Sequence, residues 1–130
     1  MILGCGVDLI EVARFERELS LGGTDLLDDL FNPAELERCR ARGRPEEGYA
    51  MGFAAKEACF KALGTGKVGA MAWRDIDVVQ GASRAHPTVT FTGETAAVAA
   101  SLGVTRVHAA LATTREQAVA WVIVTSERAP

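Results

Sequence analysis

The sequence has few of the residues and runs that indicate a disulfide-stabilised, zinc-binding or membrane-spanning protein. Its three cysteines, Cys5, Cys39 and Cys59, are odd in number and widely spaced, which argues against a disulfide framework and against a cysteine zinc site. The most apolar late run, residues 118–124, is far shorter than the ~20 residues needed to cross a bilayer. No basic leader precedes the first apolar residues. We therefore expect a protein of the reducing cytoplasm that is neither exported nor bound to a membrane.

A surplus of positive charge is also missing. The formal net charge is −3 and 24% of the residues are charged, whereas a general nucleic-acid binder needs a basic surface to neutralise phosphates. We expect no nucleic-acid partner, so any anionic ligand must be held by a local cluster of positive side chains. A hydrophobic fraction of 48% over 130 residues is typical of one globular core, and we predict a single domain over residues 1–130.

The sequence contains neither the motif of a hydrolytic triad nor a nucleotide-binding loop. His86 and His108 are far apart, and no Gly-x-Ser-x-Gly elbow accompanies them. The glycine-rich segment 64–69 fails as a Walker loop, because Lys61 stands where a glycine is needed and Val68 where a hydroxyl residue is needed. The segment also follows a predicted helix instead of preceding one. We therefore interpret it as a helix cap and turn that can offer backbone amides to an anion.

The apolar periodicity predicts an α+β fold, with helices gathered in the first half of the chain and strands in the second. A first strand over residues 2–10 is expected to end near Asp8, and the spacing of Asp8 and Glu11 is typical of a capping box that opens a helix. Asn32 followed by Pro33 is typical of a helix N-cap with proline at the first helical position, and Gly64 is expected to close the third helix. The remaining elements are helices over 33–43, 46–63 and 93–102, a turn over 21–24, and strands over 76–79, 88–91, 107–111 and 118–125.

Asp8, Glu57 and Lys61 are the polar residues whose positions invite a functional interpretation. Glu57 and Lys61 are four residues apart, so on a helix they lie along one side with about 6 Å of rise between them. A solvent-exposed ion pair worth a few tenths of a kcal/mol explains that spacing equally well. Asp8 could be a helix cap that stabilises by about 1 kcal/mol. From spacing alone these structural roles are favoured.

Two separated motifs change that interpretation. The first is GVDLIE over residues 6–11, running on to Arg14, and the second is FAAKEACFKALGTG over residues 53–66. Together they resemble the holo-acyl-carrier-protein synthase family of 4′-phosphopantetheinyl transferases, over nearly the whole chain. The resemblance implies a small α+β subunit in which an antiparallel sheet packs with a long helix. It also implies a magnesium-dependent enzyme that assembles as a homotrimer, with active sites between the subunits.

The implied reaction moves the 4′-phosphopantetheine arm of coenzyme A onto a serine of an apo acyl carrier protein and releases 3′,5′-ADP. By the resemblance, Asp8 and Glu57 become magnesium ligands, which fits the preference of magnesium for carboxylate, water and phosphate oxygens. Lys61 completes the expected catalytic set by stabilising the transition state. Glu57, or a metal-bound water beside it, is the candidate to accept the serine proton. Arg14 and Arg17, on a helix expected to be basic, would dock an acidic carrier protein. The residues expected to hold coenzyme A are Lys56, Lys61, Gly64, Thr65, Gly66, Arg42, Arg44, Pro87 and His108.

Several positions depart from the family pattern or leave alternatives open. Gly52 stands where family members usually carry an arginine, and Ala110 and Thr113 stand where they carry serine and histidine. These departures motivate a second hypothesis, a diverged, non-catalytic module that binds coenzyme A or the carrier protein. A third hypothesis, a metal-dependent phosphate hydrolase, lacks a further carboxylate or histidine at a suitable spacing. The arginines between positions 38 and 44 could contact the 3′-phosphate of coenzyme A, the carrier protein or only solvent.

Overall fold

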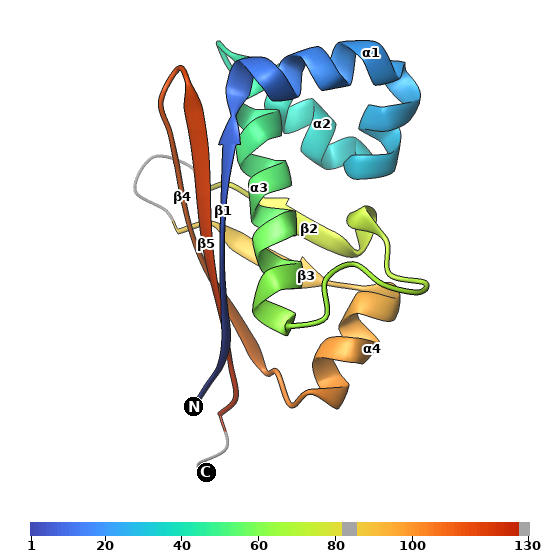
Figure 1. Ribbon diagram of the computed structural model, residues 1–130, viewed down its shortest axis with the longest axis vertical. Coiled ribbons are helices and arrows are strands. Elements are labelled where there is room, and N and C mark those ends of the chain that lie inside the picture. The colour runs from blue at the N-terminus through green and yellow to red at the C-terminus, as the bar shows by residue number, and fades with distance from the viewer. Residues whose placement is uncertain (82–85, 128–130) are drawn as a thin grey trace.

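A long helix, α3 (Pro45–Leu63), lies at the centre of the computed structural model, which describes residues 1–81 and 86–127 (Figure 1). The other elements, in chain order, are β1 (Ile2–Glu11), α1 (Val12–Leu30), α2 (Pro33–Arg40), the short 3-10 helix η1 (Trp73–Asp75), β2 (Ile76–Val79), β3 (Thr88–Phe91), α4 (Gly93–Ser101), β4 (Arg106–Thr113) and β5 (Gln117–Thr125). Strands β1, β5 and β4 form a sheet on one side of α3, while α1 and α2 lie at one end of the molecule (Figure 1). The predicted α+β fold, with an antiparallel sheet packed against a long helix, is confirmed.

The three-stranded sheet positions the N-terminal strand beside the central helix. Its order is β1-β5-β4, and both pairs are antiparallel. The register places Asp8 of β1 opposite Ala120 of β5, and His108 of β4 opposite Ile123 of β5. Every second residue of β5 is buried on the side of α3, namely Ala118, Ala120, Val122 and Val124. The β2–β3 hairpin forms as predicted, although part of its connection through Gly81 and Pro87 lies outside the described residues.

Two glycines let α3 lie directly on β1. A Cβ atom at Gly4 would overlap the backbone carbonyl of Ala62, and one at Gly6 would overlap that of Ala58. Because only glycine leaves this space free, the backbone of the helix approaches the strand closely. The contact brings Asp8, two residues beyond Gly6, beside the polar side of α3.

The predicted capping box of Asp8 and Glu11 is wrong. β1 continues as far as Glu11 because this residue still pairs with Gln117 of β5. α1 then begins with Glu11 at its N-cap and with no side-chain hydrogen bond there. The turn predicted over residues 21–24 is present as a break in α1 at Gly23, whose φ of 70° interrupts the helix.

The other helix ends follow the sequence signals more closely. Asn32 and Glu35 each accept a hydrogen bond from the other's backbone amide at 2.8 Å, which makes a capping box with Pro33 at the first helical position. α2 ends at Arg40, earlier than predicted, with its cap at the next residue. α3 ends at Gly64, which adopts the left-handed conformation with a φ of 78°, as its sequence indicates.

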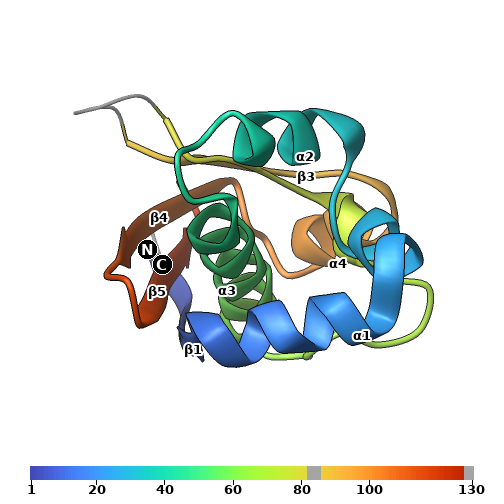
Figure 2. The same cartoon turned by 90° about the horizontal axis from the view of Figure 1, so that it is seen from above.

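The side of the three-stranded sheet that faces away from α3 carries exposed apolar side chains on β1 and β5, and no helix or strand of the described residues covers it (Figure 2). Val7 is 52% exposed, Leu9 61% and Trp121 55%. We call this side the outer sheet face. An exposed apolar patch of this kind marks an interaction surface.

Within the described ranges, no helix is both long enough and apolar enough to cross a membrane.

Candidate functional site

Asp8 and Lys61 form an ion pair between β1 and α3. The Nζ atom of Lys61 donates to Oδ1 of Asp8 at 2.8 Å and to the carbonyl oxygen of Val7 at 3.1 Å. The side chain of Lys61 is 52% exposed and that of Asp8 17%, so the pair is open to solvent on the lysine side. Lys61 is therefore ion-paired with Asp8, not with Glu57 as spacing alone favoured.

Glu57 lies one helical turn before Lys61 and within the electrostatic influence of Asp8. Burial raises the pKa of the Glu57 carboxyl group, the negative charge of Asp8 raises it further, and Lys61 lowers it. Two carboxylates and one ammonium group thus share the site. The raised pKa means that negative charge here is less stable than in water.

This carboxylate pair suits a divalent cation that prefers oxygen ligands. Positive charge between Asp8 and Glu57 would relieve the repulsion that raises the pKa of Glu57. Over residues 1–81 and 86–127, no group of three or more His, Cys, Asp and Glu side chains could hold a metal ion. The described residues therefore offer two carboxylates, and water or phosphate oxygens would have to complete the coordination of any metal ion bound there. That donor set fits Mg²⁺ and lacks the three or four nitrogen and sulfur ligands typical of zinc.

A groove of about 500 Å³ opens beside the two carboxylates. The rings of Phe15 from α1 and Phe53 from α3 line it and stack on each other, with centroids 4.9 Å apart. Arg14 and Glu18 of α1 line it as well, and the rest of the lining comes from Asp8, Leu9, Ile10, Glu11, Glu57 and Gln117. The candidate site is therefore accessible to a large substrate.

Lys56, expected to contact the phosphates of coenzyme A, is a buried structural residue instead. Its side chain has no exposed area. The Nζ atom donates to the carbonyl oxygen of Leu30 at 2.7 Å, to Oε1 of Glu35 at 2.9 Å and to the carbonyl oxygen of Trp73 at 3.2 Å. These acceptors use all three donors of an ammonium group. Burial lowers the pKa of Lys56 and the charge of Glu35 opposes that shift. The expectation of a phosphate contact is corrected: Lys56 ties α1, α2 and η1 to α3.

The loop after α3 behaves as the helix cap that its sequence indicates. The amide of Gly64 donates to the carbonyl oxygen of Lys61 at 3.0 Å, and that of Gly66 donates to the carbonyl oxygen of Phe60 at 3.3 Å. These two amides close the helix, so the structure does not leave them for a phosphate group as expected. The hydroxyl group of Thr65 donates to the carbonyl oxygen of Gly66 at 2.9 Å. Contact of this exposed loop with coenzyme A stays a prediction.

α1 carries the two arginines expected to dock the carrier protein, but the helix as a whole is not basic. Arg14 and Arg17 are both exposed, and Nε of Arg14 lies 3.5 Å from Oε1 of Glu18. The expectation of a basic helix is wrong because carboxylates outnumber these arginines. The acidic residues within its bounds are Glu16, Glu18, Asp25, Asp28 and Asp29.

The other residues expected to bind coenzyme A lie apart from Asp8 and its neighbours. Arg42 and Arg44 follow α2, and Pro87 precedes β3. In Figure 2, α2 and β3 lie on one side of α3 and α1 lies on the other. His108 is on β4, where its Nε2 is 3.1 Å from Oγ1 of Thr125. A single chain therefore brings together Asp8, Glu57 and Lys61 and leaves these four residues elsewhere.

The three departures from the family pattern occupy different environments. Gly52 lines a cavity between α2 and α3. Ala110 is exposed and pairs in the sheet with Trp121. The hydroxyl group of Thr113 donates to the carbonyl oxygens of Thr114 at 2.8 Å and Gln117 at 3.1 Å, so it serves the β4–β5 turn.

Several residues that position the site carry no functional motif in the sequence. Gly4 and Gly6 set the distance between β1 and α3, and their spacing inside a strand is a signal of close backbone approach. Phe15 and Phe53 sit in an apolar periodicity that does not distinguish a groove wall from the core. No local signal marks Glu35 as the partner of Lys56, since 21 residues separate them.

Solved structures share this architecture. The crystal structure of holo-[acyl-carrier-protein] synthase from Neisseria meningitidis matches with a TM-score of 0.87 at 28% identity, over 97% of this chain and 100% of that one. A holo-(acyl-carrier-protein) synthase from Bacillus anthracis, in complex with CoA (3′,5′-ADP), matches with a TM-score of 0.77 at 30% identity, over 98% of this chain and 99% of that one. The chain therefore has the α+β fold of these synthases.

Relatives found by sequence also match this chain over nearly its whole length. The profile of the 4′-phosphopantetheinyl transferase superfamily matches residues 4–122. A holo-[acyl-carrier-protein] synthase of Desulforudis audaxviator is 48% identical over 123 residues, which cover 95% of this chain and 92% of the relative. One from Koribacter versatilis is 40% identical over 123 residues, covering 95% and 98%. The chain belongs to the 4′-phosphopantetheinyl transferase superfamily, and the resemblance drawn from its two motifs is confirmed.

Proposed function

We propose that the protein is a holo-acyl-carrier-protein synthase, which transfers the 4′-phosphopantetheine group of coenzyme A to a serine of an apo acyl carrier protein. The observation that carries the proposal is the juxtaposition of Lys61 with Asp8 and Glu57, the two carboxylates that line the accessible groove. The two sequence relatives reported above are named for this activity, and the match covers nearly the whole length of each. A fatty-acid or polyketide carrier protein is the acceptor class.

The reaction forms one phosphorus–oxygen bond and breaks another. The serine oxygen attacks the phosphorus that bears the pantetheine arm, and the bond from this phosphorus to the bridging oxygen breaks, so that its electron pair leaves with 3′,5′-ADP. Glu57 accepts the serine proton, a role that its raised pKa favours. Lys61 moves from Asp8 to the phosphate oxygens on which negative charge builds. Asp8 and Glu57 would hold a magnesium ion, which would supply further positive charge for the phosphate groups of coenzyme A.

We also propose that the protein is a homotrimer that associates through the outer sheet face. Val7, Leu9 and Trp121 give this face its exposed apolar area, which association would remove from water. Arg42 and His108 lie away from the carboxylate site of their own chain, so a neighbouring subunit would have to supply such residues to each site. Trp121→Arg should yield monomers by light scattering and abolish transfer, whereas Leu102→Arg, at an exposed apolar residue after α4, should do neither.

The carrier protein would dock along the groove between α1 and α3. Arg14 lines the groove and supplies positive charge for the acidic residues around the acceptor serine. The apolar rings of Phe15 and Phe53 would receive the serine-bearing segment. A reducing cytoplasm is the compartment we propose, because Cys5, Cys39 and Cys59 are free.

Mass spectrometry of candidate apo carrier proteins, incubated with the protein, coenzyme A and Mg²⁺, tests the activity. The expected product gains one phosphopantetheine group. Glu57→Gln should lower kcat roughly 10³-fold, because it removes both a metal ligand and the base, while carrier binding persists. Glu94→Gln, at an exposed position on α4, is the matched control and should retain full activity. Carrier binding without any transfer by the wild-type protein would support the non-catalytic module instead.

A further inference from the structure

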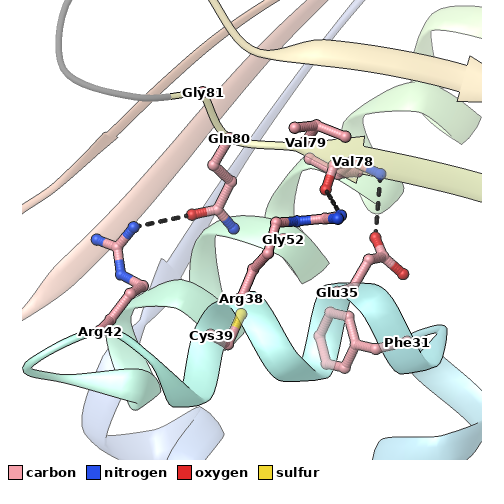
Figure 3. Close-up of a pocket in the computed structure, with 10 residues that line it drawn as sticks. All are labelled: Phe31, Glu35, Arg38, Cys39, Arg42, Gly52, Val78, Val79, Gln80 and Gly81. Atoms are coloured by element: carbon pink, nitrogen blue, oxygen red, sulfur yellow. Dashed lines mark hydrogen bonds between the residues drawn. The ribbon is translucent and has the colours of Figure 1, made fainter.

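A cavity of about 380 Å³ lies between α2, α3 and the residues that follow β2 (Figure 3). Phe31 and Val78 contribute apolar surface to its lining, and Arg38, Arg42 and Gln80 contribute polar groups. Figure 3 shows Arg42 reaching from the segment after α2 toward the side chain of Gln80. The cavity therefore combines an apolar wall with positive charge.

Residue 52 leaves this cavity open because it has no side chain. A Cβ atom at Gly52 would lie 3.1 Å from Cε1 of Phe31 and 3.5 Å from Nε2 of Gln80. A longer side chain would take the space that the Gln80 amide now occupies. Gly52 is also five residues before Glu57, and five residues turn a helix through about 140°. The cavity and the carboxylate site therefore open on different sides of α3.

Three arginines near this cavity differ in the partner that each one meets. Arg38 is 3.7 Å from a carboxylate oxygen of Asp77, and Arg44 is within 3.4 Å of two glutamates on α3. Arg42 has a neutral partner, since its Nη1 donates to Oε1 of Gln80 at 3.2 Å. Among the residues that the structure describes, no carboxylate pairs with Arg42, and Gln80 uses one of the five donors of its guanidinium group.

Gln80 is held in the orientation that presents its oxygen to Arg42. Its Nε2 donates to the carbonyl oxygen of Gly48, in the first half of α3, at 3.0 Å. The opposite orientation of the amide would place a donor against a donor and an acceptor against an acceptor. Gln80 thus fixes the guanidinium group in place without neutralising it.

We propose that Gln80 is a positioning residue that holds Arg42 in place to bind the 3′-phosphate of coenzyme A. The inference rests on the proposed function, which assigns the diphosphate of coenzyme A to Asp8, Glu57 and Lys61. The 3′-phosphate is the remaining anionic group, and a guanidinium group binds phosphate through charge-assisted, bidentate hydrogen bonds. Because the cavity opens away from Glu57, Arg42 serves coenzyme A bound at the carboxylate site of a neighbouring subunit.

Steady-state transfer with coenzyme A and with 3′-dephospho-coenzyme A tests the inference. Gln80→Ala should raise KM for coenzyme A roughly five- to tenfold, as expected when one charge-assisted hydrogen bond is weakened, and leave kcat unchanged. KM for 3′-dephospho-coenzyme A should stay the same, because that substrate lacks the recognised group. Gln80→Glu keeps a partner for Arg42 but neutralises its charge, so it should raise KM for coenzyme A at least as much.

Arg38→Ala is the matched control at the same cavity. The charge of Arg38 is already balanced by Asp77, so the ratio of the two KM values should not change. Arg42→Ala should abolish the preference for coenzyme A, and adding Gln80→Ala should have no further effect. An unchanged ratio in Gln80→Ala overturns the inference. If the wild-type protein transfers the group to no carrier, the proposed function fails instead. Calorimetric titration with coenzyme A and with 3′-dephospho-coenzyme A then tests the preference for the 3′-phosphate through the two dissociation constants.

Discussion

The helix α3 carries two lysine–carboxylate pairs that have almost the same length and opposite surroundings. Lys56 is 2.9 Å from Glu35, and the side chains are 0% and 4% exposed. Lys61 is 2.8 Å from Asp8, and the side chains are 52% and 17% exposed. The two lysines are five residues apart in one motif, so distance and sequence context do not separate their roles. Burial does.

Burial decides which lysine can exchange its partner during a reaction. An exposed ion pair contributes little free energy because water competes for both charges, so Lys61 can leave Asp8 for a phosphate group at small cost. A buried ammonium group that left its acceptors would leave an uncompensated carboxylate behind. Lys56 therefore stabilises the fold, while Lys61 is available for chemistry.

The same substitution at the two lysines gives the largest contrast. Lys56→Met keeps the length of the side chain but leaves Glu35 buried without its partner, and it should lower the free energy of unfolding by about 3–5 kcal/mol. Lys61→Met should change it by less than about 1 kcal/mol. Urea unfolding followed by circular dichroism measures both. Adding Glu35→Gln to Lys56→Met should recover part of the loss, and equal stability of the two single variants would contradict the comparison.

The effects on turnover should differ from those on stability, because Lys61, whose loss changes stability less, is the lysine proposed to act in the reaction. Lys61→Met should lower kcat about 10²-fold, the usual effect of removing one group that stabilises transition-state charge, in a fully folded protein. Lys61→Arg keeps the charge with a different geometry and should restore part of the rate. Rates are measured by single-turnover transfer to a carrier protein. A Lys61→Met variant with wild-type kcat would remove Lys61 from the mechanism.

A smaller effect separates the two arginines of α1. Arg14 lines the groove beside the carboxylate pair, so Arg14→Ala should raise KM for the carrier protein roughly fivefold, chiefly by slowing association. Arg17→Ala, on the same helix, should have a smaller effect because Arg17 is not part of the groove lining. Both effects should shrink as ionic strength rises. A carrier KM that depends on Arg17 more than on Arg14 would place docking elsewhere on the helix.

The sequence predicts the elements and the carboxylate pair better than it predicts contacts between distant segments. The capping box at Asn32 and the end of α3 at Gly64 depend on neighbouring residues, and such signals are local. The strand end predicted near Asp8 is wrong because pairing with β5, more than 100 residues later, extends β1. The phosphate contact predicted for Lys56 is wrong for the same reason, since the acceptors of Lys56 come from three other elements.

The pH dependence of stability tests the charge balance around Glu57. Burial and the charge of Asp8 raise its pKa above the usual 4.5, so in the pH range just above 4.5 the folded protein binds more protons than the unfolded chain. Stability contributed by the protonated form is therefore present below that range and is lost as the pH rises through it. Wild-type protein, unfolded with urea in the presence of a chelator, should lose stability relative to Glu57→Gln as the pH increases. Asp8→Asn should reduce this difference without abolishing it, because burial is the larger cause. A difference that stays flat, or that grows in favour of the wild type, would show that burial and the charge of Asp8 do not destabilise the ionised form of Glu57.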